Sequence, residues 1–304
     1  MKIKTWDNQF IDVDLPENTP GNLVALPALI DPHVHFRTPG AEHKENWLTG
    51  AQAAIAGGVT TVFDMPNNSP SITDYKKILE KKEIINTQLQ KINIPLNYYL
   101  YFGATKNNIA EISKIKKIKN SKIIGVKMFM SASTGTLLVD KKIDQEKIFA
   151  ECARLNLILA VHAVDCVPTA LELAKTFGTK LYICHVSTKA EINLIREYKK
   201  QNSNVYAEVT PHHLFLNTAS IKKLNTKAKM IPPLQTQENC DALWQAISDG
   251  TIDTIGTDHA PQTLEEKNVA YEKAPAGVPG VETCLPLLLN AYNNNKISLE
   301  KIVE

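Results

Sequence analysis

The sequence has no excess of charge of either sign and no long apolar segment. Its 304 residues carry 34 basic and 32 acidic side chains, a formal net charge of +2. A balanced charge argues against a protein that binds nucleic acid through bulk positive charge. No run approaches the roughly 18 apolar residues of a membrane span, and the N-terminus lacks the apolar core of a secretory signal. We therefore expect no nucleic-acid partner and no membrane segment.

Paired cysteines are also absent. The five cysteines are an odd number, lie far apart and form no Cys-x-x-Cys motif: Cys152, Cys166, Cys184, Cys240 and Cys284. This pattern is atypical of a disulfide scaffold and favours a reducing compartment, so we expect a cytoplasmic protein whose cysteines are small core residues. The composition, 43% hydrophobic and 22% charged, is that of a globular protein and not of a disordered one.

Short apolar runs alternate with stretches of helical character. Strands are expected over residues 23–30, 59–65, 94–102, 123–130, 157–162, 180–186, 205–209 and 251–257. Helices are expected over residues 44–56, 73–88, 107–119, 145–154, 168–177, 189–199, 238–248 and 282–292. Continuous apolar runs suit strands that are buried on both faces of a parallel sheet. The alternation predicts an α/β protein built as a (β/α)₈ TIM-type barrel, with a doubly wound open sheet as the alternative.

The N-terminal residues stand outside this alternation. Residues 2–5 and 10–15 are candidates for two short strands of an accessory sheet, and Pro16, Pro20 and Gly21 mark the join to the barrel. We therefore expect a small β segment over residues 1–22 and the barrel over residues 23–304.

Most of the histidines follow predicted strands. His33 and His35 come after the first strand, His162 and His185 end the fifth and sixth, and Asp258 follows the eighth. The carboxyl ends of barrel strands converge at one mouth, so these side chains should meet there. His33 and His35 point the same way in an extended segment. Imidazole and carboxylate ligands without a thiolate indicate a hydrolytic site of the zinc type.

Lys127 ends the predicted fourth strand and should face the same mouth among apolar neighbours. One interpretation is a lysine whose ammonium group reaches solvent past an apolar stem. The other is a buried lysine, whose lowered pKa makes a neutral amine that reacts with carbonyl groups. The residues alone leave both interpretations open.

The order of seven motifs resembles the amidohydrolase superfamily and, within it, the dihydroorotases. The motifs are LPALIDPHVHFRTPG, GGVTTVFDMPNN, GVKMFMS, ICHVS, AEVTPHHL, IGTDHAP and AGVPGVET, and the resemblance runs from about Gly21 to Leu289. It implies a distorted (β/α)₈ barrel of the metal-dependent hydrolase kind, in agreement with the alternation. It also implies a small-molecule substrate: reversible hydrolysis of the cyclic amide of L-dihydroorotate to N-carbamoyl-L-aspartate, in de novo pyrimidine (UMP) biosynthesis.

The resemblance also implies the roles of the ligands. Two Zn²⁺ ions would be held by His33, His35 and Asp258 on one side and by His162 and His185 on the other, with a carboxylated Lys127 as the bridge. Two such cations, about 3.5–4 Å apart, lower the pKa of water and polarise a carbonyl group. Asp258 would be the catalytic residue that moves a proton to the amide nitrogen as the C–N bond breaks. Zinc, manganese and cobalt all suit these ligands.

The substrate contacts that the resemblance implies are Arg37, Asn67, Gln262, Ala276 and Gly277. Arg37 suits a bidentate grip on the substrate carboxylate, and Asn67 would add a hydrogen bond. Ala276 and Gly277 would bring backbone groups to the ring, since glycine permits a close approach. His212 and His213 belong to a family motif, and we expect them to support the site from behind.

Two departures from the family pattern fall in this pocket. Gln262 stands where the family usually has a histidine that holds the substrate carboxylate, and Ile231 stands where asparagine is common. They favour another cyclic amidohydrolase, such as a hydantoinase or allantoinase, whereas Arg37 and Asn67 favour a dihydroorotase. A third alternative is a non-catalytic homologue that supports a transcarbamoylase. Such chains typically lose metal ligands, and this one retains them all.

The C-terminus departs from the family as well. Family members usually continue past the eighth helix and return to the accessory sheet, whereas this sequence stops at Glu304. We expect that return to be absent. The oligomeric state stays open, with a homodimer as the commonest default, and so does the association of an active enzyme with aspartate transcarbamoylase.

Overall fold

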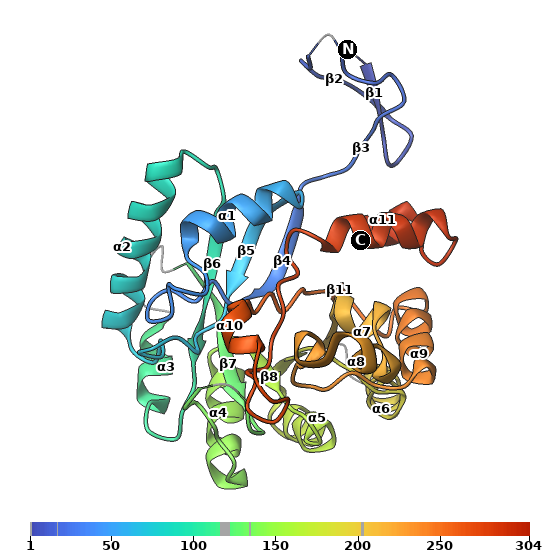
Figure 1. Ribbon diagram of the computed structural model, residues 1–304. Coiled ribbons are helices and arrows are strands. Elements are labelled where there is room, and N and C mark those ends of the chain that lie inside the picture. Colours follow the sequence, from blue (N-terminus) through green and yellow to red (C-terminus); the bar gives the residue numbers. More distant parts are fainter. Residues whose placement is uncertain (1, 17, 116–121, 134, 202–203) are drawn as a thin grey trace.

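The computed structural model describes residues 2–16, 18–115, 122–133, 135–201 and 204–304 (Figure 1). Eight parallel strands form one sheet in the order β11-β10-β9-β8-β7-β6-β5-β4. They are β4 (Leu29–Val34), β5 (Val59–Asp64), β6 (Asn97–Gly103), β7 (Ile123–Phe129), β8 (Ile158–His162), β9 (Lys180–Ile183), β10 (Val205–Val209) and β11 (Thr254–Ile255). Each strand lies beside the one before it in sequence, without the reversal of order that marks a doubly wound sheet.

The two ends of the sheet meet around His259. Its backbone forms parallel bridges to Val34 and to Val278, and its carbonyl oxygen accepts the N–H of His35 at 2.8 Å. Lower in the barrel, the N–H of Thr257 donates to the buried carboxylate of Asp31 at 3.0 Å. These contacts close the barrel where β11 is too short to do so, and they confirm the predicted (β/α)₈ architecture.

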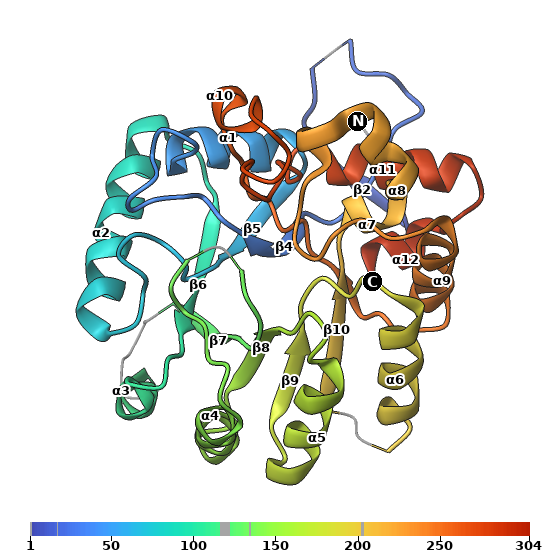
Figure 2. The same cartoon turned by 60° about the horizontal axis from the view of Figure 1, so that its bottom comes forward.

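Helices surround the strands (Figures 1 and 2). The main helices that follow the strands are α1 (Trp47–Ala56), α2 (Tyr75–Ile92), α3 (Ile109–Ile115), α4 (Lys142–Arg154), α5 (Val167–Phe177), α6 (Lys189–Lys199), α9 (Gln237–Ser248) and α11 (Cys284–Asn293). Capping boxes at Asn46 and Thr188 fix where α1 and α6 begin. Among the described residues, no helix combines the length and apolar character needed to cross a bilayer.

The described residues also form five further helices, four in the connections and one after α11, and the sequence did not predict them. They are α7 (Pro211–Phe215), α8 (Thr218–Leu224), the 3₁₀ helix η1 (Asn225–Ala228), α10 (Leu264–Lys267) and α12 (Leu299–Val303). One or two turns are too few to produce a recognisable helical period. The end of the helix predicted over residues 107–119 lies in residues 116–121, outside the described part of the chain.

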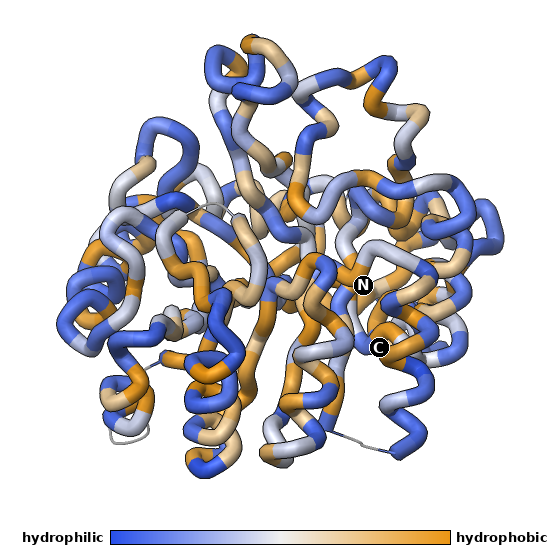
Figure 3. The backbone as a smooth tube through the Cα atoms, turned by 90° about the horizontal axis from the view of Figure 1, so that it is seen from below, coloured by the Kyte–Doolittle hydropathy of each residue, from blue (hydrophilic) through white to orange (hydrophobic). Residues whose placement is uncertain are grey.

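The core fills the space between the strands and the helices, and apolar segments run along both (Figure 3). Val62, Leu100, Val126, Leu159 and Leu181, one from each of five adjacent strands, are fully buried. All five cysteines are free, and every one except the half-buried Cys166 is buried. The expectation that they are mainly core residues is therefore confirmed.

A separate three-stranded sheet precedes the barrel and projects from it (Figure 1). Its order is β2 (Phe10–Asp12), β1 (Lys2–Thr5) and β3 (Val24–Ala25). The strand predicted over residues 23–30 is thus divided in two: β3 pairs with β1, and β4 begins at Leu29. Pro27 lies in the gap, where it has no N–H to donate to a ladder.

A buried ion pair ties α2 to the ends of β4 and β5. Lys81 of α2 binds the carboxylate of Asp64, and each is 1% exposed. Lys81 Nζ also donates to Asn68 Oδ1 at 2.7 Å. The other oxygen of Asp64 accepts the N–H of Phe36 at 2.8 Å. The pair therefore fixes the backbone that follows the adjacent strands β4 and β5.

Replacing Lys81 with methionine should destabilise the fold strongly, because it leaves the Asp64 carboxylate buried without its counter-charge. We expect Lys81→Met to lower the free energy of unfolding by about 3–5 kcal/mol, measured by urea denaturation at neutral pH. The matched control is Lys76→Met on the same helix, whose side chain is 86% exposed and which should change stability by less than about 0.5 kcal/mol. Equal effects of the two substitutions would contradict this assignment.

Candidate metal centre

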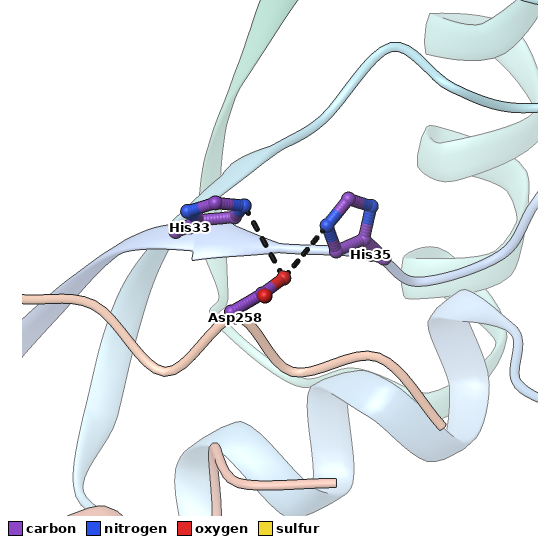
Figure 4. A group of neighbouring side chains, drawn as sticks. All are labelled: His33, His35 and Asp258. Carbon is purple, nitrogen blue, oxygen red and sulfur yellow. Dashed lines mark hydrogen bonds and ion pairs between the residues drawn. The ribbon is translucent and has the colours of Figure 1, made fainter. Parts of the chain in front are cut away.

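Three candidate ligands converge at the mouth of the barrel (Figure 4). His33 and His35 come from the end of β4, and Asp258 follows β11. Asp258 Oδ1 lies 2.9 Å from His35 Nε2 and 3.3 Å from His33 Nε2. The three side chains each offer one ligand atom to a single position. The alternation of His33 and His35 along one strand thus brings two imidazoles to one carboxylate, as the sequence predicts.

Both imidazoles are oriented through their other nitrogen. His33 Nδ1 lies 2.8 Å from Glu208 Oε1, and His35 Nδ1 lies 2.8 Å from Asn67 Oδ1. Because both partners are acceptors, Nδ1 carries the proton in each ring. Nε2 is therefore directed toward Asp258 as the nitrogen that would bind a metal ion.

His162 and His185 form a second pair of converging nitrogens. His162 Nδ1 and His185 Nε2 are 2.9 Å apart, and the His185 ring lies 5.5 Å from the ring of His33 between centroids. Burial lowers the pKa of His162 to about 3 and also lowers that of His185. Two neutral imidazoles that face each other suit a shared cation, since neutral nitrogen is the form that binds metals.

Lys127 lies beside these ligands near the end of β7 and is buried, which excludes the interpretation in which its ammonium group reaches solvent. Its Nζ donates to Cys184 Sγ at 2.9 Å and lies 5.1 Å from the centre of the Phe129 ring. In the described part of the chain, no carboxylate forms an ion pair with it. A thiol and a ring face are weak partners for a buried ammonium group, whose isolation from water is costly.

Three residues of the site have left-handed backbone conformations. The φ angles are 59° at Arg37, 39° at His185 and 47° at Asp258. Residues other than glycine adopt this region at a cost, and they persist there only where the surroundings impose it. The His185 N–H, for example, donates to Glu208 Oε1 at 2.9 Å. The surrounding contacts thus hold Arg37, His185 and Asp258 in unfavourable backbone conformations that direct their side chains into the site.

The charge of Asp258 is fixed by its two histidine neighbours. Burial alone would raise the pKa of Asp258, but His33 and His35 hold it well below its usual range. The carboxylate is therefore ionised across the neutral pH range. An ionised carboxylate at this position can bind a cation or accept a proton.

One cavity contains all six metal-ligand candidates together with Arg37, Asn67, Ala276 and Gly277. Arg37 Nε donates to the carbonyl oxygen of Pro261 at 3.1 Å. Its Nη2 is buried and has no hydrogen-bond partner among the described residues. A buried guanidinium donor without an acceptor indicates a place for an anionic group of a ligand.

Gln262 has a different place from the one that the resemblance implies, since it does not line this cavity. Its Nε2 donates to the Ala276 carbonyl oxygen at 2.8 Å, and its Oε1 accepts from Lys44 Nζ at 2.8 Å. Gln262 therefore supports the backbone of Ala276 from behind. Ile231 does line the cavity.

Sequence reasoning missed Glu208, which is fully buried on β10. Besides His33 and His185, its carboxylate accepts from the hydroxyl of Tyr182 at 2.7 Å. With His33 and Cys184 it forms a second convergent group. The sequence did contain a signal for it, because Glu208 is the only acidic residue in the AEVTPHHL motif and lies in an otherwise largely apolar strand.

The two adjacent histidines of the same motif differ in their surroundings. His213 bonds to Thr210 and to the carbonyl oxygen of Pro232, at 2.7 and 3.1 Å, and so has a supporting position. His212 lines the cavity.

Comparison of the sequence with protein-family models identifies the general class of protein. The model of the Amidohydrolase family matches residues 24–303. The chain belongs to this family, whose metal-dependent chemistry fits the ligands described above.

Similar sequences then define a narrower class of enzyme. A dihydroorotase of Methanosarcina mazei is 37% identical, over 95% of this chain and 70% of its own length. A dihydroorotase of Methanosphaera stadtmanae is 34% identical, over 96% and 70%. The multifunctional protein CAD of Squalus acanthias is 37% identical over 93% of this chain, which corresponds to 12% of that protein. The chain thus spans about 70% of the length of these two dihydroorotases.

Solved structures show the same barrel. The L-hydantoinase of Arthrobacter aurescens superimposes with a TM-score of 0.86 at 25% identity, over 98% of this chain and 75% of that one. A dihydroorotase of Campylobacter jejuni gives 0.72 at 20% identity, over 90% and 79%, and shows the fold alone.

Replacing Glu208 with glutamine should weaken metal binding, because His33 then loses the carboxylate that orients its ring. We expect Glu208→Gln to lower zinc affinity about 10- to 100-fold, measured by competition with a chromogenic chelator. Glu197→Gln, at a side chain that is 68% exposed, is the control and should leave affinity unchanged. The same affinity in both variants would show that Glu208 has only a packing role.

Proposed function

We propose that this chain is a dihydroorotase that interconverts L-dihydroorotate and N-carbamoyl-L-aspartate. The observation that carries the proposal is a single cavity in which metal-ligand candidates from five strands meet the buried Nη2 of Arg37, which has no partner in the described part of the chain. Three similar sequences support this substrate, because they are named dihydroorotases and are 33–37% identical to this chain. The likeness to a hydantoinase structure makes hydantoin hydrolysis the second candidate.

The same proposal includes two Zn²⁺ ions. His33, His35 and Asp258 would hold one, and His162 with His185 the other. These donors fit zinc, since they combine imidazole nitrogens with an ionised carboxylate and leave room for substrate. Bound there, the ions would activate water and polarise the amide carbonyl group.

The bridge between the ions would be a carboxylated Lys127. Its amine nitrogen would form a bond to the carbon of CO₂ and release one proton, which gives a carbamate anion. The buried position of Nζ beside a thiol and a phenyl ring supports this modification, because an unpaired ammonium is unfavourable there. The two cations would then supply the counter-charge that the carbamate needs.

The chain's own residues have separate tasks in this reaction. Arg37 binds the substrate carboxylate through its buried Nη2. Asp258 accepts a proton and delivers it to the ring nitrogen as the C–N bond breaks, and its backbone conformation keeps the carboxylate at the ligand position. The backbone of Ala276 and Gly277 holds the ring on the other side of the cavity.

The setting of the enzyme is also part of the proposal. We place it in the cytoplasm, with a small β segment over residues 1–22 beside the barrel. Two relatives are multifunctional proteins in which the matching segment forms 12% of the length. These relatives support a setting in which such a barrel works beside other domains. We propose aspartate transcarbamoylase as the partner, and a homodimer is the second assembly to test.

The direct test is hydrolysis of L-dihydroorotate by zinc-loaded protein, followed as loss of ring absorbance. Asp258→Ala should abolish turnover because it removes both a ligand and the proton carrier.

Arg37→Lys should raise KM about tenfold, since lysine cannot form the bidentate contact. Hydrolysis of hydantoin with none of L-dihydroorotate, at full metal content, would replace this function with the second candidate.

The carbamate can be tested separately. Protein prepared with isotopically labelled bicarbonate should show a carbamate carbon by NMR, and Lys127→Ala should lack that signal and bind less zinc. Added acetate should restore part of the zinc binding, because its carboxylate fits the space that Lys127 leaves. Lys180→Ala, on β9, is the control that should retain the signal. A wild-type protein with two zinc ions and no carbamate carbon would contradict the bridge.

A further inference from the structure

Part of the cavity lining contains no metal-ligand candidate and no charged side chain. This part is called the apolar wall, and it consists of Met230, Ile231, Ala260, Ala276, Gly277 and Val278. A polar ring that rests against it can be recognised only by backbone groups and by shape. Substrate affinity then depends on where the backbone of the wall lies.

The side chain of Lys267 ties together the two segments that carry most of this wall. Lys267 is the last residue of α10, and it is only 6% exposed. Its Nζ donates to the carbonyl oxygens of Thr226 at 3.1 Å, Lys229 at 3.1 Å and Pro275 at 2.9 Å. A lysine ammonium group has three N–H donors, so each of them is matched.

The charge of Lys267 has no carboxylate partner within the described residues, where the ion pairs involve other lysines. Three carbonyl dipoles stabilise it instead. This arrangement specifies a position more closely than an ion pair would, because each oxygen belongs to the main chain and moves only with its segment.

Two of the three oxygens belong to residues that directly precede the wall in sequence. Lys229 precedes Met230, and Pro275 precedes Ala276. The segments are also joined directly, since the Gly277 N–H donates to the Lys229 oxygen at 3.0 Å. The Lys229 carbonyl oxygen therefore accepts two hydrogen bonds, one from the Gly277 N–H of the wall and one from the ammonium group of Lys267.

A second lysine ties the first of these segments to residues 271–272, which precede the second segment in the same loop. Lys229 Nζ donates to the carbonyl oxygens of Tyr271 at 2.6 Å and Glu272 at 3.0 Å. Gln262 adds a third tie, through its bond to the Ala276 oxygen. The wall is thus held from behind by side chains that do not themselves line the cavity.

The wall has little room to move without loss of contact. Gly277 has a φ of +115°, and a Cβ atom built there would lie 2.5 Å from the carbonyl oxygen of Ala260. The backbone therefore passes Ala260 at a distance that only glycine permits. A small displacement of the segment changes the shape that the ring meets.

We propose that Lys267 is a positioning residue that sets substrate affinity by joining the 226–231 and 275–277 segments into one fixed wall. The inference rests on the proposed function for its substrate and on the described contacts for its mechanism. A lysine with a purely structural role would affect stability, whereas this one should affect KM.

The test compares Lys267→Met with Lys273→Met, an exposed lysine of the same loop. Methionine keeps the length of the stem and removes all three donors. We expect Lys267→Met to raise KM for L-dihydroorotate about tenfold or more, with kcat and zinc content nearly unchanged, because no metal ligand is touched. Lys273→Met should match the wild type in all three quantities.

A second variant covers the case in which Lys267→Met does not fold. Lys267→Gln keeps two N–H donors and should raise KM by an intermediate factor at wild-type zinc content. Unchanged KM in the folded variant would overturn the inference, and so would a fall in kcat or zinc content at constant KM.

Failure of the proposed function would look different. In that case the wild-type protein would not hydrolyse L-dihydroorotate at full zinc content. The same comparison of KM with kcat would then be made with hydantoin, and an unchanged KM for hydantoin in Lys267→Met would overturn the role of Lys267 independently.

Discussion

The site depends on how the barrel closes between its first and last strands. β11 has two residues, and the closure continues beyond it through the backbone of His259, which bridges Val34 and Val278. The ring of His259 takes part as well. Its Nδ1 accepts the N–H of Gly280 at 3.0 Å, so its Nε2 carries the proton that Glu45 accepts at 2.9 Å.

This closure produces the convergence of ligands. Asp258 directly precedes His259 in sequence. The His259 carbonyl oxygen accepts the N–H of His35, and this bond holds Asp258 next to the side chains of His33 and His35. The left-handed conformation at Asp258 turns the carboxylate toward the two rings. One set of main-chain contacts thus closes the barrel, places the acid among the imidazoles and fixes Val278 of the apolar wall.

The sequence predicted the features that depend on local pattern. Strands β5 to β10 are short apolar runs, and His33, His35, His162 and His185 could be placed because each follows a strand. What it missed depends on contacts between distant residues. Glu208 meets His33 across 175 positions, and Gln262 is turned away from the cavity partly by Lys44, 218 positions earlier. Spacing along the chain carries no information about such pairs.

Three lysines are buried in the described part of the chain, and each has a different partner for its charge. Lys81 has a carboxylate, and Lys267 has three main-chain carbonyl oxygens. Lys127 has a thiol and a ring face. The first two are therefore satisfied as ammonium groups, and each holds the backbone beside the site. The third is not, and it is the one that lies among the metal-ligand candidates. The difference in partners separates the two supporting lysines from Lys127 without reference to any related protein.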